Sequence, residues 1–270
     1  MTPAQPPFKD SQWAQDPKAC ARKALACLDL TSLNTADTEA DIARLCERAQ
    51  GRFGPVAAVC VWPRLAAYAR SQLPASIGVA AVANFPDGSS DTARAVRETG
   101  AIVQAGAQEV DLVLPFAALQ AGDERAVAAL LQAVRRAAEG LVLKVILETG
   151  VLQDEALIER ACALALDAGA DFLKTSTGKT PVSATPQAAT VLLRAIASRA
   201  STRDRVGFKP SGGIRTVADA ATYLALTEAW LGPQALQPQR FRLGASSVLS
   251  DIEAVLAGQA APGTPTPGGY

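Results

Sequence analysis

The sequence predicts a single α/β domain built as a (β/α)8 barrel, with a short N-terminal arm and a flexible C-terminal tail. Eight short apolar, mostly β-branched runs recur along the chain. Their starts lie about 31 residues apart on average, which is the length of one strand–helix unit. Between the runs lie segments with helical periodicity, such as Ile42, Leu45, Cys46 and Ala49. Eight such units within 270 residues favour a barrel over an open doubly wound sheet.

The expected strands are the apolar runs themselves, and each is bounded by polar, glycine or proline residues. They are Cys27–Leu30, Val56–Val61, Ile77–Ala83, Glu109–Leu114, Leu141–Leu147, Asp171–Thr175, Val206–Phe208 and Phe241–Leu243. A second helical pattern, Val127, Leu130, Leu131 and Val134, lies between the fourth and fifth runs. We assign residues 1–17 to the arm, 18–257 to the barrel and 258–270 to the tail, which is rich in glycine and proline.

Composition excludes several classes of function. The 26 basic and 26 acidic residues balance, so nothing indicates nucleic acid or an anionic membrane as a partner. No apolar stretch is long enough for a transmembrane helix, and the N-terminus has no apolar signal core. The five cysteines have no CxxC spacing, so we expect reduced thiols in a cytoplasmic protein. With no histidine and no cysteine pair, we expect no zinc site, and no acidic cluster indicates a Mg²⁺ site.

Three strand-like stretches each lead into a lysine: Leu-Val-Leu-Lys144, Asp-Phe-Leu-Lys174 and Val-Gly-Phe-Lys209. An apolar strand that carries a lysine to its end can partly desolvate the ammonium group and lower its pKa. A second ammonium nearby lowers that pKa further, which yields a neutral amine nucleophile. Because the chain has no imidazole, proton transfer falls to carboxylates, lysines, tyrosines or water. The combination indicates Schiff-base chemistry on a carbonyl substrate.

In a barrel, side chains at the carboxyl ends of the strands face one common mouth. We therefore expect Asp29, Asp111, Lys144, Lys174 and Lys209 around that mouth. Asp111 has apolar neighbours in sequence, so its carboxylate needs a partner, and a lysine is the obvious one. Two simpler interpretations stay open: a lysine that only extends toward solvent from a strand end, and a purely structural salt bridge at Asp111.

Two loops have features of an anion site. Gly212 and Gly213 follow the seventh run and allow backbone amides to approach an anion, and Thr216 can cap the next helix. Ser246 and Ser247 follow the eighth run. Loops after strands seven and eight commonly bind phosphate in barrels, although ordinary turn chemistry is the alternative.

Two nucleotide motifs and one cysteine nucleophile are disfavoured. The segment 177–180 resembles the end of a P-loop, but Leu173 stands where the first glycine is required. No G-x-G-x-x-G follows the first run, which weakens a dinucleotide-binding interpretation. Cys60 lies within an apolar run and is more typical of a core residue than of a nucleophile.

Six segments in order resemble the 2-deoxyribose-5-phosphate aldolases, a family of class I aldolases, over about residues 24–257. They are Leu28–Leu33 (LDLTSL), Asn84–Gly88 (NFPDG), Glu109–Val113 (EVDLV), Leu143–Thr149 (LKVILET), Asp171–Gly178 (DFLKTSTG) and Gly207–Gly213 (GFKPSGG). The resemblance implies a TIM barrel and a cofactor-free, reversible aldol reaction. The implied substrate is 2-deoxy-D-ribose 5-phosphate, cleaved to acetaldehyde and glyceraldehyde 3-phosphate in deoxyribonucleotide catabolism.

The same resemblance implies a role for individual residues. Lys174 would form the imine, Lys209 would depress its pKa, and Asp111 would move protons directly or through water. Tyr270 matches a C-terminal tyrosine that approaches the substrate in bacterial members. The positions that match phosphate-binding residues are Gly178, Lys179, Gly212, Gly213, Ser246 and Ser247. We also expect Asp29, Thr31, Lys144 and Thr175 to contact the substrate.

Two alternatives remain from the sequence. Another Schiff-base barrel enzyme, transaldolase-like or specific for keto acids, would share the imine lysine and differ in its substrate contacts. A sugar-phosphate-binding barrel without catalysis would bind its ligand tightly without turnover. A donor screen separates the first from the aldolase, since acetaldehyde as donor favours the aldolase. The chain is expected to act as a monomer or a homodimer.

Overall fold

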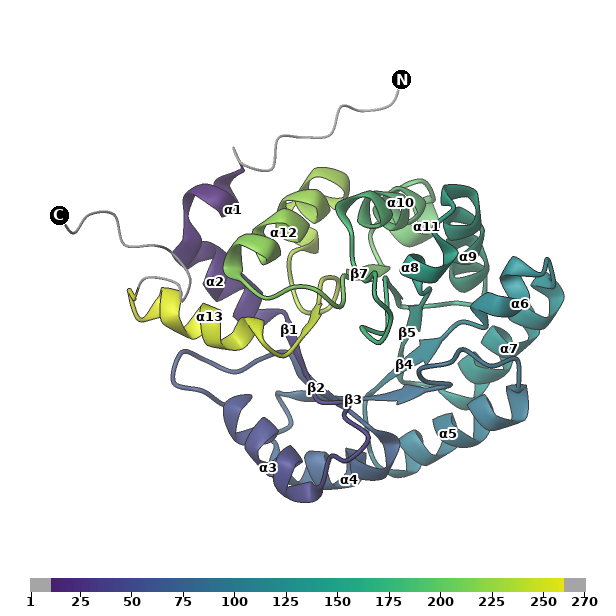
Figure 1. Ribbon diagram of the computed structural model, residues 1–270, viewed down its shortest axis with the longest axis horizontal. Helices are drawn as coiled ribbons and strands as arrows, with labels where there is room; N and C mark the ends of the chain where they lie inside the picture. The colour runs from purple at the N-terminus through teal and green to yellow at the C-terminus, as the bar shows by residue number, and fades with distance from the viewer. Residues whose placement is uncertain (1–10, 260–270) are drawn as a thin grey trace.

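The computed structural model describes residues 11–259, in which eight parallel strands form a TIM barrel surrounded by helices (Figure 1). The strands are β1 (Leu28–Thr31), β2 (Ala58–Val61), β3 (Gly78–Ala83), β4 (Glu109–Val113), β5 (Val142–Ile146), β6 (Phe172–Lys174), β7 (Gly207–Lys209) and β8 (Leu243–Ala245). Their order around the sheet is β7-β6-β5-β4-β3-β2-β1-β8. Each expected run overlaps a strand, so the predicted fold class is confirmed.

Single residue pairs join β7 to β8 and bring the barrel almost to closure. Phe208 pairs with Phe241, and Ser211 pairs with Gly244. Four backbone hydrogen bonds support this seam: from Phe208 N to Arg240 O (2.9 Å), from Arg242 N to Phe208 O (3.1 Å), from Gly244 N to Pro210 O (2.9 Å) and from Gly212 N to Gly244 O (3.3 Å). The seam brings the loops that follow β7 and β8 next to each other, and both loops carry residues expected to bind phosphate.

The helices lie outside the barrel (Figure 1). They are α1 (Gln12–Gln15), α2 (Pro17–Ala26), α3 (Glu39–Arg48), α4 (Pro63–Gln72), α5 (Thr92–Gln104), α6 (Phe116–Gln120), α7 (Glu124–Ala137), α8 (Thr149–Leu152), α9 (Glu155–Asp167), α10 (Pro186–Ala197), α11 (Ala200–Arg203), α12 (Val217–Leu231) and α13 (Val248–Leu256), with a 3-10 turn, η2 (Pro233–Ala235). None of the helices within residues 11–259 is both long and apolar enough to cross a membrane.

Local sequence explains where these helices begin and which face they bury. Thr216 accepts a hydrogen bond from Asp219 N while the Asp219 side chain accepts from Thr216 N, so the predicted cap of α12 is confirmed as a capping box. Both apolar patterns found in the sequence are buried. They are Ile42, Leu45, Cys46 and Ala49 in and just after α3, and Val127, Leu130, Leu131 and Val134 in α7.

The barrel interior has two chemically different parts. Side chains from β2 to β5 form a small apolar cluster that includes Cys60, Val82, Val113 and Ile146. The remaining interior space is filled by charged side chains from β1 and from β4 to the seam at β8. The larger hydrophobic core lies between the strands and the helices. The fold therefore gathers seven charged side chains inside the barrel, where they can reach one another.

The predicted arm and tail extend beyond the described residues. Residues 11–17 include α1, and Trp13 Nε1 donates a hydrogen bond to Glu228 Oε2 on α12 (2.9 Å). Residues 1–10 and 260–270, with Tyr270 among them, lie outside the described part of the chain.

Candidate active site

Lys174 and Lys209 are the last residues of neighbouring strands and stand side by side in the sheet register. Both side chains are buried, and Lys174 retains 2 % exposure. Phe172 and Lys174 share the inner face of β6, as strand alternation requires, while Leu173 joins the outer core. The two lysines thus reach the upper end of the interior together.

Three other residues expected at the mouth lie deeper. Asp29, Asp111 and Lys144 each precede the last residue of their strand by two positions, and all three are fully buried. The expectation that they surround the mouth was wrong, because β1, β4 and β5 continue beyond them. Their side chains instead form the layer beneath Lys174 and Lys209.

Asp111 joins the two upper lysines. Its Oδ2 accepts a hydrogen bond from Lys174 Nζ and another from Lys209 Nζ, each 2.7 Å long. Lys209 Nζ also donates to Asp29 Oδ2 at 2.5 Å. One carboxylate oxygen is therefore shared by two lysine nitrogens, which places the second basic group close to the first.

Below these residues lies a buried ion network, which we define as Asp29, Glu109, Lys144 and Arg242. Lys144 Nζ donates to Asp29 (3.0 Å), to Asp111 (3.1 Å) and to Glu109. Arg242 donates from Nη1 to Asp29 Oδ1 and from Nη2 to Glu109 Oε1, at 2.6 Å each. Each carboxylate in the network contacts at least two cations, so its buried charge is compensated.

The environment separates the pKa values of the three lysines. Burial lowers the pKa of Lys174; Asp111 opposes this effect, but the Lys209 ammonium adds to it, and the pKa stays below its usual value. Burial would also lower the pKa of Lys209 and of Lys144. For both, the nearby carboxylates outweigh burial and hold the pKa above its usual value.

The carboxylates are correspondingly held as anions. Burial would raise the pKa of Asp111, but Lys144, Lys174 and Lys209 keep it well below its usual value. The pKa values of Asp29 and Glu109 are lowered for the same reason, with Arg242 and Lys144 as the main cations. Cys60 Sγ lies 3.9 Å from Asp111 Oδ2, and burial raises the pKa of this thiol to about 11, which fits a core residue.

The charges of this cluster balance when Lys174 is neutral. The linked side chains comprise three carboxylates, Asp29, Glu109 and Asp111, and four basic groups, Lys144, Lys174, Lys209 and Arg242. An arginine stays protonated in proteins, and the raised pKa values of Lys144 and Lys209 keep them charged. The hydrogen bond from Lys174 to Asp111 does not require an ammonium, because a neutral amine still carries N–H donors.

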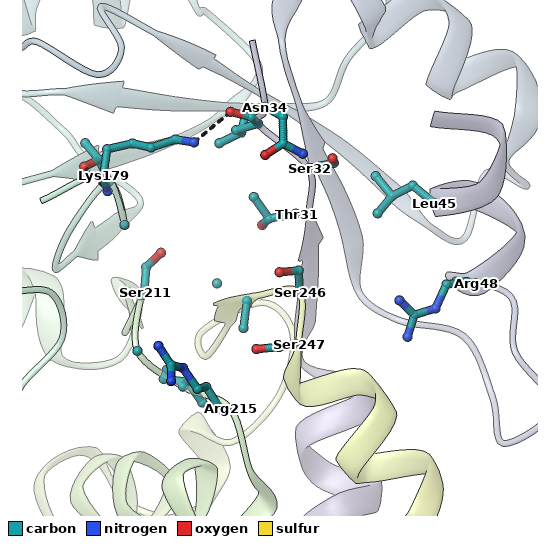
Figure 2. A pocket seen from close by; sticks show the side chains of 18 residues that line it. Thr31, Ser32, Asn34, Leu45, Arg48, Lys179, Ser211, Arg215, Ser246 and Ser247 are labelled. Atoms are coloured by element: carbon teal, nitrogen blue, oxygen red, sulfur yellow. Dashed lines mark hydrogen bonds between the residues drawn. The ribbon is translucent and has the colours of Figure 1, made fainter. Parts of the chain in front are cut away.

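A pocket of about 440 Å³ opens between the loops that follow β1, β6, β7 and β8 (Figure 2). Lys174, Lys209 and Asp111 do not line it themselves. All six positions matched to phosphate binding, Gly178, Lys179, Gly212, Gly213, Ser246 and Ser247, line it, and so does Thr31. In Figure 2, Ser211, Ser246 and Ser247 border the open space. Lys179 Nζ reaches across it to the Leu33 carbonyl at 2.9 Å. The structure thus brings together the residues expected to bind phosphate.

Thr175 has a different position from the one expected. Its hydroxyl accepts from Ser211 N (3.0 Å) and lies 3.3 Å from Ser211 O, and it does not line the pocket. Thr175 therefore links the ends of β6 and β7.

The described residues contain no group of three or more potential ligands that could hold a metal ion, and the carboxylates of the cluster are bound by lysine and arginine side chains instead.

Sequence reasoning missed Glu109 and Arg242 as members of the cluster, and Arg48 and Arg215 as pocket residues. A charged residue inside each of two apolar runs was the available signal for Glu109 and Arg242. Their pairing spans 133 positions and depends on closure of the barrel, which the sequence does not specify. Arg48 ends α3 and looked like an ordinary helix-terminal cation.

Residues 23–255 match the DeoC/LacD family aldolases. The chain belongs to this family. It is 50% identical over 247 residues to a deoxyribose-phosphate aldolase of Agrobacterium fabrum, and the match covers 90% of this chain and 94% of the relative.

Solved structures agree with this assignment. The crystal structure of a putative deoxyribose-phosphate aldolase from Coccidioides immitis superposes with a TM-score of 0.76 at 31% identity, covering 87% of this chain and 86% of that one. A putative deoxyribose-phosphate aldolase from Toxoplasma gondii ME49 gives a TM-score of 0.82, covering 94% of this chain and 99% of that one. At 24% identity, the second likeness supports the fold alone.

Proposed function

We propose that this protein reversibly cleaves 2-deoxy-D-ribose 5-phosphate to acetaldehyde and D-glyceraldehyde 3-phosphate through a Schiff base on Lys174. The observation that carries this proposal is the position of Lys174: a buried amine with a lowered pKa, in contact with a carboxylate and next to a second lysine. A neutral lysine amine adds to an aldehyde, whereas an ammonium cannot. The 50% identical relative is a deoxyribose-phosphate aldolase, which supports the same substrate.

The reaction follows from the groups around Lys174. The amine adds to the sugar aldehyde at C1, and loss of water gives an iminium. The C3 hydroxyl then loses its proton, to Asp111 through water, while the C2–C3 bond breaks and its electron pair moves toward the iminium nitrogen. Glyceraldehyde 3-phosphate leaves, and an enamine remains on Lys174. Protonation of that enamine at carbon, followed by hydrolysis, releases acetaldehyde and restores the amine.

Lys209 and Asp111 have distinct parts in this cycle. Lys209 remains an ammonium through its contacts with Asp29 and Asp111, so its charge keeps the pKa of Lys174 low. Asp111 accepts hydrogen bonds from both lysines and stays ionised, so it can receive a proton when the substrate supplies one. The deeper network of Asp29, Glu109, Lys144 and Arg242 holds Asp111 in place.

The pocket between the loops suits the 5-phosphate. Gly178, Gly212 and Gly213 allow backbone amides to approach an anion, and Ser246, Ser247 and Lys179 add hydroxyl and ammonium donors. Its volume of about 440 Å³ is within the range of small-molecule sites. A phosphate bound there fixes the far end of the sugar while C1 reaches down to Lys174.

Borohydride trapping with acetaldehyde, followed by peptide mass mapping, tests the proposal. A two-carbon adduct on Lys174 is expected, which would establish both the nucleophile and the donor. Lys174→Met should lose the adduct, while Lys18→Met, at an exposed lysine of α2, should retain it. An adduct spread over surface lysines, or none at all, would refute the Schiff-base assignment.

Tyr270, outside the described residues, is proposed to assist protonation of the enamine. Its deletion should slow proton exchange at the methyl carbon of acetaldehyde more than it weakens phosphate binding. Equal exchange rates in the two proteins would remove Tyr270 from the mechanism.

The further proposals concern location and assembly. The five cysteines lie in the described part of the chain as free, buried thiols, which supports a reducing, cytoplasmic setting. The protein is proposed to be either a monomer or a homodimer that forms through exposed helices. Light scattering in solution distinguishes the two states.

A further inference from the structure

Glu148 has an unusual backbone conformation just beyond β5. Its φ is 57° and its ψ is 56°, in the left-handed region, and its side chain is fully buried. Residues other than glycine, asparagine and aspartate adopt this conformation rarely, because the Cβ atom crowds the backbone. Such a conformation persists where surrounding contacts determine it, and it concentrates at functional sites.

The Glu148 carboxylate binds the loop that follows β6. Its Oε2 accepts from Thr177 N (3.3 Å) and from Thr177 Oγ1 (2.5 Å). Its Oε1 lies 3.2 Å from Thr180 Oγ1, a hydroxyl that can donate to it or to Val182 O at 2.9 Å. Thr177 Oγ1 in turn accepts from Lys179 N at 3.0 Å. Whereas cations hold Asp29, Glu109 and Asp111, amide and hydroxyl donors of a single loop hold Glu148.

The loop is also confined on both sides by close backbone packing. A Cβ atom on Gly150 would lie 1.9 Å from the Val182 carbonyl oxygen, so the segment after Glu148 lies directly against the loop. On the other side, a Cβ atom on Gly212 would lie 2.5 Å from Ser183 Oγ and 3.1 Å from the Gly178 Cα. Residues 177–183 are therefore held between the end of β5 and the loop that follows β7.

We propose that Glu148 is the positioning residue of the pocket between the loops that follow β1, β6, β7 and β8, and that it fixes Gly178 and Lys179 in the orientation that receives the substrate's phosphate. Glu148 acts through Thr177 and Thr180 and does not line the pocket itself. This proposal rests on the proposed function, since it assigns the pocket to a phosphate.

The contacts explain what the negative charge of Glu148 contributes at this position. Oε2 of Glu148 accepts hydrogen bonds, and the N–H of Thr177 has a fixed direction and cannot become an acceptor. A glutamine would have to direct its NH2 toward Thr177 or toward Thr180. Directed toward Thr180, the NH2 meets a hydroxyl that can donate to Val182 O (2.9 Å) instead, so glutamine preserves the fold. Its neutral oxygen is a weaker acceptor for Thr177 than the carboxylate, which loosens the loop.

Glu148→Gln tests the proposal. We expect the KM for 2-deoxyribose 5-phosphate and the dissociation constant for inorganic phosphate, measured by calorimetry, to rise about tenfold, the effect of replacing the charged acceptor of buried hydrogen bonds by a neutral one. The kcat/KM for unphosphorylated 2-deoxyribose should remain unchanged, because that substrate does not use the loop. Glu155→Gln is the matched control, since Glu155 is an exposed carboxylate that pairs with Arg194 on the surface.

Equal losses with both substrates, or an unchanged affinity for phosphate, would overturn the proposal. If Glu148→Gln does not fold, Thr180→Val removes one hydroxyl donor and should weaken phosphate binding about threefold, with rescue by Thr180→Ser. An unchanged phosphate affinity in Thr180→Val would contradict the assignment. Calorimetry with phosphate does not depend on turnover, so failure here is distinguishable from a wild-type protein that cleaves no sugar phosphate.

Discussion

The buried ion network and the upper end of the barrel interior each contain a buried lysine, and the pKa values of these two lysines are shifted in opposite directions. In the network, Lys144 contacts three carboxylates, and its pKa lies above the usual value. At the upper end of the interior, Asp111 is the one carboxylate of residues 11–259 that pairs with Lys174. Lys174 stands beside Lys209, and its pKa lies below the usual value. Both side chains are almost completely buried, so burial alone does not decide which lysine becomes a nucleophile. The neighbouring charges decide it: three carboxylates surround Lys144, whereas one carboxylate and the Lys209 ammonium stand beside Lys174.

The two regions also differ in what their charges contribute. In the network, every charge is matched, and the matching holds Asp111 and Lys209 in place. At the upper end of the interior, the two lysines Lys174 and Lys209 share the single carboxylate of Asp111, so Lys174 holds its proton weakly. The comparison predicts that substitutions in the network act mainly on stability, whereas substitutions at the upper end act mainly on rate and pH dependence.

The largest effect is expected for Lys174→Leu, which removes the nucleophile and leaves the network charges matched. The kcat/KM should fall by about four orders of magnitude or more, because the covalent route is lost. The thermal midpoint should not decrease, since an apolar side chain replaces a buried amine. Steady-state assays and calorimetry measure the two quantities, and retention of substantial turnover would exclude Lys174 as the nucleophile.

Arg242→Met addresses the opposite region. It removes one cation that contacts both Asp29 and Glu109, which leaves buried negative charge without compensation. We expect a loss of about 3–5 kcal/mol in the free energy of unfolding, the usual cost of removing one partner of a buried ion pair. Denaturant titration measures the loss. Arg160→Met is the control, because its pair with Glu124 is exposed, and a similar loss in the control would invalidate the comparison.

Lys209→Leu removes the cation that stands beside Lys174 and also contacts Asp29 of the buried ion network. Without the Lys209 ammonium, the pKa of Lys174 should rise, because a like charge that disfavoured protonation is gone. Since the neutral amine is the active form, the acidic limb of the rate profile should move to higher pH, and activity at neutral pH should fall roughly 100-fold. Lys209→Arg retains the charge and should retain the limb near its original pH. A pH profile for Lys209→Leu that matches the wild type would exclude the proposed role.

The smallest effect is expected for Gly212→Ala in the pocket. A Cβ atom there would lie 2.5 Å from Ser183 Oγ, and the φ of 82° is unfavourable for alanine. The loops should shift apart, and the KM for the phosphorylated substrate should rise about tenfold. Activity toward unphosphorylated 2-deoxyribose should be preserved. If kcat/KM decreased equally for both substrates, the substitution would not act through the phosphate pocket.

Much of the fold could be predicted because each strand–helix unit carries a local signal. Apolar runs identify the strands, helical periodicity identifies the faces of α3 and α7, and a capping box begins α12. The eighth strand was predicted two residues too close to the N-terminus: the expected run is Phe241–Leu243, whereas β8 is Leu243–Ala245. Phe241 contacts β7 only through an isolated pair at the seam, a detail that depends on how the barrel closes.

The sequence predicted which residues meet at the site, but it predicted less well how deep in the barrel each of them lies. Lys174, Lys209 and Asp111 do meet, because strand ends in a barrel converge. Asp29 and Lys144 lie lower than expected, since two further residues of each strand follow them. Glu109 and Arg242 were missed because their pairing spans 133 positions and depends on closure of the barrel. The sequence gives Glu148 no specific role, because a left-handed backbone has no sequence signature in a glutamate.

The most direct test of the central claim is an NMR titration of lysines labelled with 13C at Cε, with Lys174→Met and Lys144→Met spectra to assign the signals. The account predicts that Lys174 titrates below the usual lysine pKa while Lys144 remains protonated throughout the accessible range. If Lys174 titrated at or above the usual value, or together with Lys144, the neighbouring charges would not determine which buried lysine is reactive.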